Sequence, residues 1–264
     1  YASLLKKIHS LTDVHGAAEL GLIKWIAHFA TNGSDLQEAF LIVCARGHLE
    51  AAKGIVHSNA DVDVRAHDDG AFRYSCWHGH LEVAKWLASL NACVDVRAHN
   101  DWAFRYACAY GRLEVAKWLL SLNAGVDVRT FDDDAFQLCC AGGHLEVAKW
   151  LLSLNAGVDV RAQNDEAFQN SCAGGHLEVA KWLLSLSASV DVRAQNDEAF
   201  RESCRNGHLE MAKWLLSLNA GVDVRAENDE AFRKSCVRGH LEVAKWVVSL
   251  IAGVDVRAKN EFPF

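Results

Sequence analysis

The chain has 264 residues, of which 51% are hydrophobic and 23% are charged, with a single proline and 18 glycines. This composition is typical of an ordered protein and excludes a disordered one. The net charge of −7 excludes the basic character of nucleic-acid-binding proteins. No apolar run reaches the roughly 18 residues that a membrane-spanning helix needs, because Lys24 and His28 interrupt the most apolar stretch, at 20–30. We therefore expect neither nucleic acid nor a membrane as a partner.

A segment that reads GHLEVAKWLLSL in its most regular copies recurs at a fixed step of 32 residues. The glycine that opens it recurs without insertion or deletion at Gly47, Gly79, Gly111, Gly143, Gly175, Gly207 and Gly239. A repeat of about 20 to 50 residues indicates a solenoid, in which each unit buries its apolar side against its neighbours. We predict a single array over 1–264, with a degenerate first unit at 1–35, seven repeats at 36–258 and the start of another at 259–264.

The first predicted element of each repeat is a short helix, helix A. In one representative repeat, Asn164 and Asp165 supply side-chain acceptors for a helix start, so helix A is predicted over 166–173. Phe168 and Cys172 are four residues apart and belong to its narrow inward face. Two glycines follow and allow the chain to reverse.

The second predicted element, helix B, covers 177–186 and is apolar except for one thin stripe with Glu178 and Lys181. A helix so apolar is expected to be buried over most of its circumference. Trp182 alone would remove about 150–250 Å² from water, worth about 4–6 kcal/mol at about 25 cal/mol per Å². We predict that each helix B is sandwiched between neighbours. Its tryptophan recurs as Trp86, Trp118, Trp150, Trp182, Trp214 and Trp246.

An extended connector is predicted after helix B, because the residues at 190–193 alternate between valine and a charged side chain. The aspartate and arginine of this connector recur from Asp63 and Arg65 to Asp255 and Arg257. Stacked repeats would then form a ladder of opposite charges along one edge.

Seven of the nine cysteines occupy one equivalent position in each repeat, namely Cys44, Cys76, Cys108, Cys140, Cys172, Cys204 and Cys236. Stacked helices are about 8–10 Å apart, whereas a disulfide needs Cα atoms within about 7 Å. We therefore expect buried, unpaired thiols and a reducing, cytoplasmic compartment. The chain begins at Tyr1 and stops early in a repeat, so we expect both ends to be cut from a longer protein or processed.

The order helix, tight turn, helix and extended loop, with GHLEVAKWLL in helix B and VDVRA in the loop, resembles the ankyrin repeat. That family reads GHLEVVKLLL in its second helix and ADVNA in its loop. Over 36–258 the resemblance implies an all-α, ankyrin-type solenoid of stacked helix-turn-helix repeats with short extended inter-repeat loops. The chain departs in its 32-residue rather than 33-residue step, in NDEAF for TPLH, and in a tryptophan after the helix B lysine. Such variants are similar to arrays in giant DNA viruses and protists.

Comparison of the repeats with one another suggests a binding surface, because helix B is nearly constant whereas helix A and the loop before it vary. In ankyrin-like stacks these variable positions line a concave groove. In the first half of the chain they carry the residues that we predict to bind a protein or peptide: His67, Tyr74, Trp77, His78, His99, Trp102, Tyr106, Tyr110, Phe131 and Leu138. The alternatives are neutral drift, or packing of these side chains on one another. The last repeats are charged there, with Arg201, Glu202, Arg205, Arg233, Lys234 and Arg238.

The histidine before the helix B leucine is expected to close the turn between the helices. It recurs as His48, His80, His144, His176, His208 and His240, with Arg112 in one repeat. One ligand per repeat does not assemble a metal shell, so we expect no metal and no cofactor; only Cys76, His78 and His80, with His67 and Asp68, suggest adventitious binding. The acidic run at 132–134 is interpreted as a helix N-terminus.

The sequence contains no glycine-rich phosphate loop and no nucleophile elbow, so no catalytic residues are predicted. The expected function is a non-enzymatic protein–protein interaction scaffold that binds a protein or peptide on its concave helix A face. The alternative is a structural arm of a larger assembly, associated through its ends. An enzyme is the third hypothesis, and it lacks any converging acid, base, nucleophile or metal ligands.

Overall fold

The computed structural model describes residues 33–58, 62–90, 94–186 and 190–251. Within these residues the chain forms fourteen helices and no strand, which confirms the predicted all-α class. The chain divides into two compact units, 1–130 and 131–264. That the units form one array stays a prediction. The degenerate unit at 1–35 lies almost entirely outside the described residues, and 259–264, with Asp255 and Arg257, lies wholly outside them.

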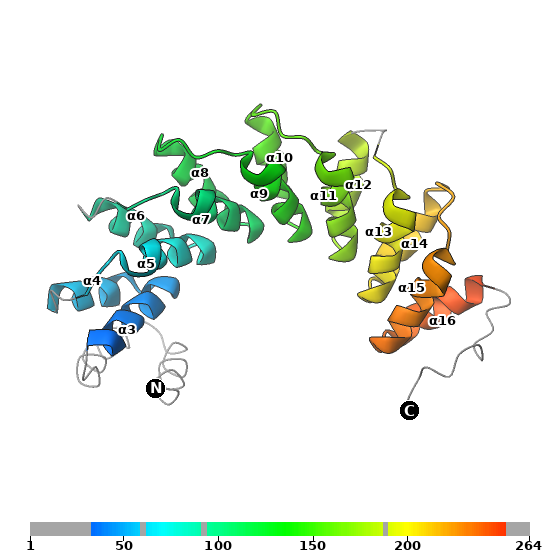
Figure 1. Cartoon of the computed structure of the whole chain (residues 1–264), viewed down its shortest axis with the longest axis horizontal. Helices are drawn as coiled ribbons and strands as arrows, with labels where there is room; N and C mark the ends of the chain where they lie inside the picture. The colour runs from blue at the N-terminus through cyan, green and yellow to red at the C-terminus, as the bar shows by residue number, and fades with distance from the viewer. Residues whose placement is uncertain (1–32, 59–61, 91–93, 187–189, 252–264) are drawn as a thin grey trace. The chain divides into compact units, whose positions relative to one another are not determined.

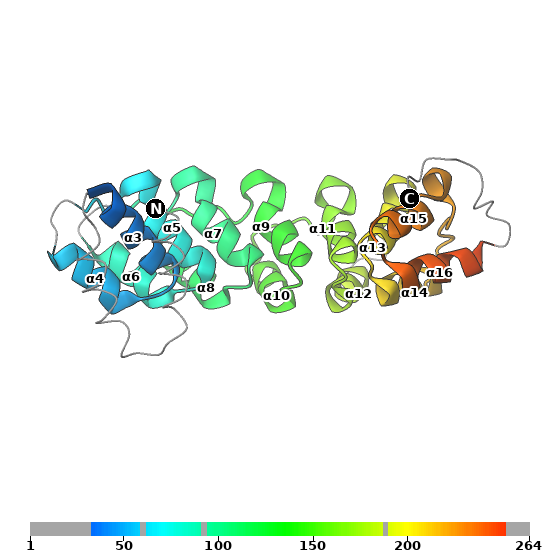
Figure 2. The same ribbon diagram turned by 90° about the horizontal axis from the view of Figure 1, so that it is seen from below.

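Unit 1 consists of helical pairs, each with one helix A and one helix B. The pairs are α3 (Gly33–Ala45) with α4 (Leu49–Ser58), α5 (Ala66–His78) with α6 (Leu81–Ser89), and α7 (Ala98–Ala109) with α8 (Leu113–Ser121). Helix α5 packs against both α3 and α7. Figures 1 and 2 show these three helices as one row and the three B helices as a second row.

Unit 2 repeats this arrangement. Its pairs are α9 (Thr130–Ala141) with α10 (Leu145–Ser153), α11 (Ala162–Ala173) with α12 (Leu177–Leu186), α13 (Ala194–Arg205) with α14 (Leu209–Ser217), and α15 (Ala226–Val237) with α16 (Leu241–Leu250). Helix α13 packs against both α11 and α15, and the A and B helices again form separate rows (Figure 2).

Helix B has the predicted bounds, but it is less buried than predicted. In α12 the side chains of Val179, Ala180 and Leu183 are buried, whereas Trp182 is half-buried and Leu186 is 44% exposed. The prediction of burial over most of the circumference is wrong. Because the B helices form an outer row, only the side toward the A helices is covered.

The core lies between the two rows, and a phenylalanine of helix A is its largest side chain. Phe168 is 1% exposed beside the buried Cys172, as predicted. In five of the B helices the half-buried tryptophan packs on the phenylalanine of the preceding repeat, so the indole joins two repeats. Centroids of these ring pairs are 6.2–6.4 Å apart in Phe40–Trp86, Phe72–Trp118, Phe136–Trp182, Phe168–Trp214 and Phe200–Trp246.

Each helix A from α5 onward opens with a left-handed turn of three residues, which the sequence analysis did not predict. In α11 these are Gln163, Asn164 and Asp165, with φ of 54°, 58° and 63°, and the right-handed helix follows from the predicted start at 166. A left-handed residue other than glycine costs about 1–2 kcal/mol, least for Asn and Asp. The second and third turn positions are Asn or Asp in every described repeat from α5 onward, which explains the constant pair.

The carboxylate at the third turn position connects two repeats rather than capping its own helix. Asp165 is 2% exposed and accepts hydrogen bonds from Arg161 Nε at 2.9 Å and from the backbone N–H of Asp191, in the next connector, at 3.1 Å. The predicted cap is therefore wrong. The predicted charge ladder is also misassigned, because Arg161 pairs with Asp165 and the connector's Asp159 accepts the backbone N–H of Arg161.

The first two residues of the acidic run at 132–134 belong to the left-handed turn of α9, so the run is not simply a charged helix end. Asp133 is fully buried and accepts the backbone N–H of Asp159 at 3.0 Å. The carbonyl of Asp132 in the left-handed turn accepts Gln137 Nε2 at 3.0 Å. The same hydrogen bond recurs in the described repeats from α5 onward: an arginine or glutamine side chain donates to the carbonyl of the residue five positions before it. The donors are Arg73, Arg105, Gln137, Gln169, Arg201 and Arg233.

The histidine before helix B contacts the preceding repeat, in addition to lying at its own turn. The imidazole of His80 forms a hydrogen bond with the backbone of Ala45 and lies against Gly47. A Cβ at Gly47 would overlap this imidazole, and the φ of 81° at Gly47 also favours glycine. Arg112 occupies the same place against Gly79.

Candidate interaction surface

The structure places the predicted site residues in both units. His67, Tyr74, Trp77, His78, His99, Trp102, Tyr106 and Tyr110 belong to unit 1, whereas Phe131 and Leu138 belong to unit 2. Phe131 is 55% exposed in the left-handed turn of α9, and Leu138 is half-buried further along that helix. The eight residues of unit 1 form the candidate site.

Four aromatic side chains of α5 and α7, together with Tyr110 directly after α7, form one continuous cluster, which we call the aromatic face: Tyr74, Trp77, Trp102, Tyr106 and Tyr110. Trp102 and Tyr106 stack with centroids 4.2 Å apart, and Trp77 meets Tyr110 edge-on at 5.3 Å. Tyr74 and Trp102 join the two helices at 6.0 Å. These side chains therefore pack on one another, as the alternative prediction stated. This packing also joins the five rings into one surface.

The aromatic face is partly open to solvent. Tyr110 is 45% exposed and the other four rings are half-buried. The indole N–H of Trp77 is buried and has no hydrogen-bond partner within the described part of the chain. At the Trp77 position the next repeats carry Ala109, Ala141 and Ala173, so the fold itself requires no aromatic ring there.

Two arginines border the aromatic face. The guanidinium of Arg73 lies 5.2 Å from the ring centroid of Trp102, and that of Arg105 lies 6.0 Å from the centroid of Tyr106, both within cation–π range. His99 Nε2 lies 3.3 Å from Asp68 Oδ2, in the left-handed turns of the two repeats. These contacts orient the polar edge of the cluster.

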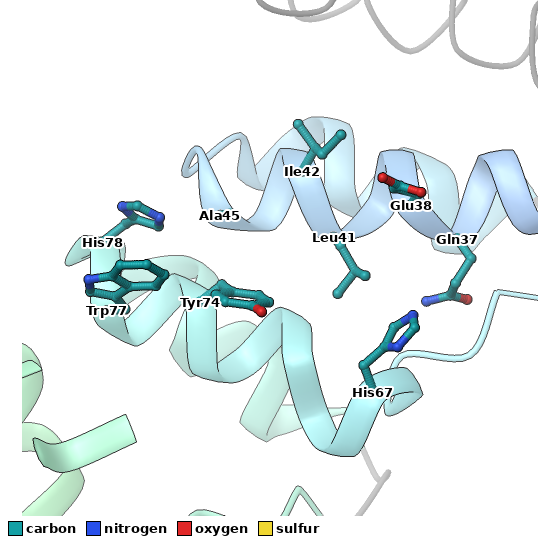
Figure 3. A pocket seen from close by; sticks show the side chains of 9 residues that line it. All are labelled: Gln37, Glu38, Leu41, Ile42, Ala45, His67, Tyr74, Trp77 and His78. Carbon is teal, nitrogen blue, oxygen red and sulfur yellow. The ribbon is translucent and has the colours of Figure 1, made fainter. Parts of the chain in front are cut away.

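A pocket of about 710 Å³ adjoins the aromatic face between α3 and α5. Figure 3 shows Gln37 and Leu41 of α3 pointing toward α5, with Gln37 near His67 at one end and Trp77 near the other. The full lining is Gln37, Glu38, Leu41, Ile42, Ala45, His67, Tyr74, Trp77 and His78. A volume of this size is typical of binding pockets.

The α3 side of this pocket was missed by the sequence analysis. Leu41 and Ile42 occupy the positions where the next repeat has Arg73 and Tyr74, so their apolar character was a usable signal. Gln37 replaces the buried aspartate of later repeats: its Nε2 donates to the carbonyl of Asp63 at 2.8 Å, and its Oε1 accepts the backbone N–H of Asp63 at 2.9 Å.

The charged positions predicted in the last repeats are largely engaged within unit 2. Arg201 pairs with Glu230, and Arg205 pairs with Glu202 at 2.9 Å. Arg233 donates to the carbonyls of its own left-handed turn. The surface of these A helices is therefore a network of charges, in contrast to the aromatic face of unit 1.

Among the described residues, the cysteines at the equivalent position of each repeat are buried except for the last one. Six of the equivalent cysteines are buried, whereas Cys236 is exposed, which corrects the prediction for that position. Burial raises the pKa of Cys204 to about 12 and raises the pKa of Cys76 as well, so neither is a ready thiolate ligand or nucleophile.

The described residues contain neither a cluster of metal ligands nor a helix that could span a membrane. Within 33–58, 62–90, 94–186 and 190–251 no group of three metal-ligating side chains comes together. None of the helices in those ranges has the length and apolar character required to cross a membrane.

Comparison with known families identifies the repeats. The model for ankyrin repeats in three copies matches residues 104–196 and 172–260, and the model for ankyrin repeats in many copies matches 40–88. No curated protein matches the chain in sequence. Ankyrin repeats are in general protein–protein interaction modules, and proteins built from them are typically non-enzymatic scaffolds. The matches cover most of the chain, and together with the stacked helical pairs they show that it belongs to the ankyrin repeat family.

Proposed function

We propose that the chain is a non-enzymatic scaffold that binds a protein or peptide on the A helices of unit 1, across the aromatic face and the adjoining pocket. The observation that carries this proposal is the cluster of five tryptophan and tyrosine rings on two neighbouring helices. Such rings dominate the binding energy of protein interfaces. Because they already contact one another, little side-chain entropy is lost when a partner binds.

The other repeats support this assignment because they show what the same positions carry elsewhere. The position of Tyr106 is Leu138, Asn170 and Glu202 in the first three repeats of unit 2, and that of Trp77 is Ala173 in the second. The repeats that carry Asn170, Glu202 or Ala173 form the same helical pair. The fold therefore does not require aromatic rings at these positions. Exposed apolar clusters of this kind mark interaction sites.

The test exchanges aromatic residues for those of sister repeats. We expect the double variant Trp77→Ala, Tyr106→Asn to lose proteins that the wild-type chain captures from cell lysate, as quantified by mass spectrometry. The variant should keep its helical circular dichroism, because both new residues occur at these positions in the array. The buried indole N–H of Trp77 has no hydrogen-bond partner among the described residues, so its removal leaves none of their acceptors without a donor.

The matched control places the same kind of change on unit 2. Asn170→Ala alters the position equivalent to Tyr106 and should leave the captured set unchanged. If the double variant and this control capture the same proteins as the wild type, the A helices of unit 1 are not the binding surface.

The second candidate, a structural arm that associates through its ends, is favoured by exposed apolar side chains in the last described repeat. Val237 and Leu241 are 69% and 60% exposed, whereas the equivalent Ala173 and Leu177 are half-buried. This candidate predicts that the mass measured by light scattering rises with protein concentration. The variant Val237→Lys, Leu241→Lys should then abolish the rise, and a constant mass for the wild type would exclude the candidate.

A further inference from the structure

The pocket between α3 and α5 is a groove that runs along α3. Its α3 lining consists of Gln37, Glu38, Leu41, Ile42 and Ala45, whose spacing of three and four residues places them on one side of the helix. Figure 3 shows apolar and aromatic side chains in the middle of this groove and polar side chains toward its ends. The two ends differ in charge.

One end of the groove is electropositive. His78 lines it, and Arg112 lies beside it, because Arg112 Nε donates to the carbonyl of Trp77 at 3.3 Å. Burial lowers the pKa of His78, and the charges of Arg112 and then Arg46 lower it further. Burial also lowers the pKa of His80, as do His78, Arg112 and His48, against a hydrogen bond to Ala45 that raises it. No described carboxylate is among these influences.

The described carboxylates near the groove are distant from this end or already paired. Glu38 precedes Ala45, which lines the groove at the His78 end, by seven residues, which is about 10 Å along the helix axis. Asp68 lies against His99. The buried Asp69 accepts Arg65 Nε at 3.0 Å. The basic end therefore complements an anionic group.

Arg112 is the residue that departs from the repeat pattern at this end. All other described repeats carry histidine there, at His48, His80, His144, His176, His208 and His240. Histidine supports the same contact against the preceding glycine, as His80 does at Gly47. The stack therefore does not require arginine at this position, and the permanent charge is available for another purpose.

We propose that this groove binds an acidic peptide segment of a partner protein, with a large apolar side chain between Leu41 and Tyr74 and a carboxylate at the end formed by His78 and Arg112. This inference rests on the proposed function and specifies its partner. Leu41 and Ala45, which both line the groove, are about 6 Å apart along α3. An extended peptide rises about 3.3 Å per residue, so the acidic residue lies about two positions from the apolar one.

The experiment is a selection of random twelve-residue peptides, displayed on phage, against the full chain. We expect the enriched peptides to carry Asp or Glu about two positions from Leu, Ile, Met or an aromatic residue. The strongest peptide is then synthesised with a fluorescein label, together with a version that has amides in place of its carboxylates. The amide version should bind about tenfold more weakly by fluorescence anisotropy, because it loses charge-assisted hydrogen bonds.

The protein variants locate the carboxylate. Arg112→His restores the residue of the sister repeats and should weaken the acidic peptide about tenfold at pH 8. At pH 6 the loss should be smaller, because a bound carboxylate favours the protonated form of the new histidine. Lys117→Gln removes one charge from the helix B stripe, where Lys117 pairs with Glu114, and should change the affinity less than about twofold.

Several outcomes overturn the inference. They are enriched peptides that are neutral or basic, acidic peptides insensitive to Arg112→His, and displacement of the peptide by a single-stranded oligonucleotide at equal concentration. Peptides without acidic residues that still lose affinity in the variant Trp77→Ala, Tyr106→Asn would leave the proposed function standing. Peptides insensitive to both sets of variants would contradict the inference and the proposed function together.

Discussion

At the residue scale, the buried aspartate of the left-handed turn connects adjacent repeats through hydrogen bonds on two sides. Asp165 joins the arginine four residues before it to the backbone of the next connector. The same two contacts recur at Asp69, Asp101 and Asp197. A charge buried with hydrogen bonds on two sides holds adjacent repeats in register, and its removal leaves donors without acceptors.

We predict that Asp165→Ala lowers the free energy of unfolding by about 2–3 kcal/mol, because it leaves the N–H of Asp191 and the guanidinium of Arg161 without their acceptor. Asp159→Ala is the control, since its exposed carboxylate accepts only a local backbone bond, and it should cost less than about 1 kcal/mol. Urea unfolding followed by circular dichroism measures both. Equal costs would show that the connection between repeats is unimportant.

The histidines between repeats predict a dependence of stability on pH. Burial lowers the pKa of His208 in the folded state, and His176 and His240 lower it further, against a hydrogen bond to Ala173 that raises it. The unfolded chain therefore binds protons more readily, so the free energy of unfolding falls as the pH drops through about 6.5. Above that pH the contribution is fully present.

The prediction is checked by thermal unfolding of the wild type and of His208→Gln between pH 8 and pH 5. The variant should lose less stability than the wild type over this range. Lys213→Gln, a control without a group that titrates there, should follow the wild type. A parallel fall for His208→Gln and the wild type would contradict this role of His208.

At the element scale, the left-handed turn determines which residues the start of helix A tolerates. Asn164 has a φ of 58°, where asparagine is tolerated, alanine is strained and glycine is free. Asn164→Ala should therefore destabilise the chain by about 1 kcal/mol, whereas Asn164→Gly should be neutral within about 0.5 kcal/mol. Urea unfolding distinguishes this turn from a right-handed start, at which alanine would be the more stable of the two.

The helices illustrate what the sequence can and cannot predict. The bounds of α12 were predicted because its residues are apolar apart from one thin polar stripe, a pattern with helical period. Phe168 was predicted to face inward because it is four residues from Cys172. The left-handed turn was missed because an Asn-Asp pair indicates a helix cap equally well. The pairing of Arg161 was misassigned, since partners two and four residues away compete and only the local backbone conformation decides between them.

At the scale of the whole molecule, the fixed repeat predicted the stack of helical pairs that each unit shows. The residues of the aromatic face were predicted as one variable surface because the repeats serve as an internal comparison, in which Trp77 and Tyr106 stand where later copies carry Ala173 and Asn170. The groove beside it was not predicted. Its volume depends on how far apart α3 and α5 lie, and no single repeat contains that information.

The central claim is that a partner covers the A helices of unit 1. Hydroxyl-radical footprinting of the full chain, with and without its selected peptide, tests this most directly because it measures the exposure of individual aromatic side chains. We predict reduced oxidation of Tyr74, Trp77 and Tyr106 in the complex, with unchanged oxidation of the half-buried Trp182 and Trp214 on the B helices of unit 2. Protection of Trp182 and Trp214, with the aromatic face unchanged, would contradict the claim.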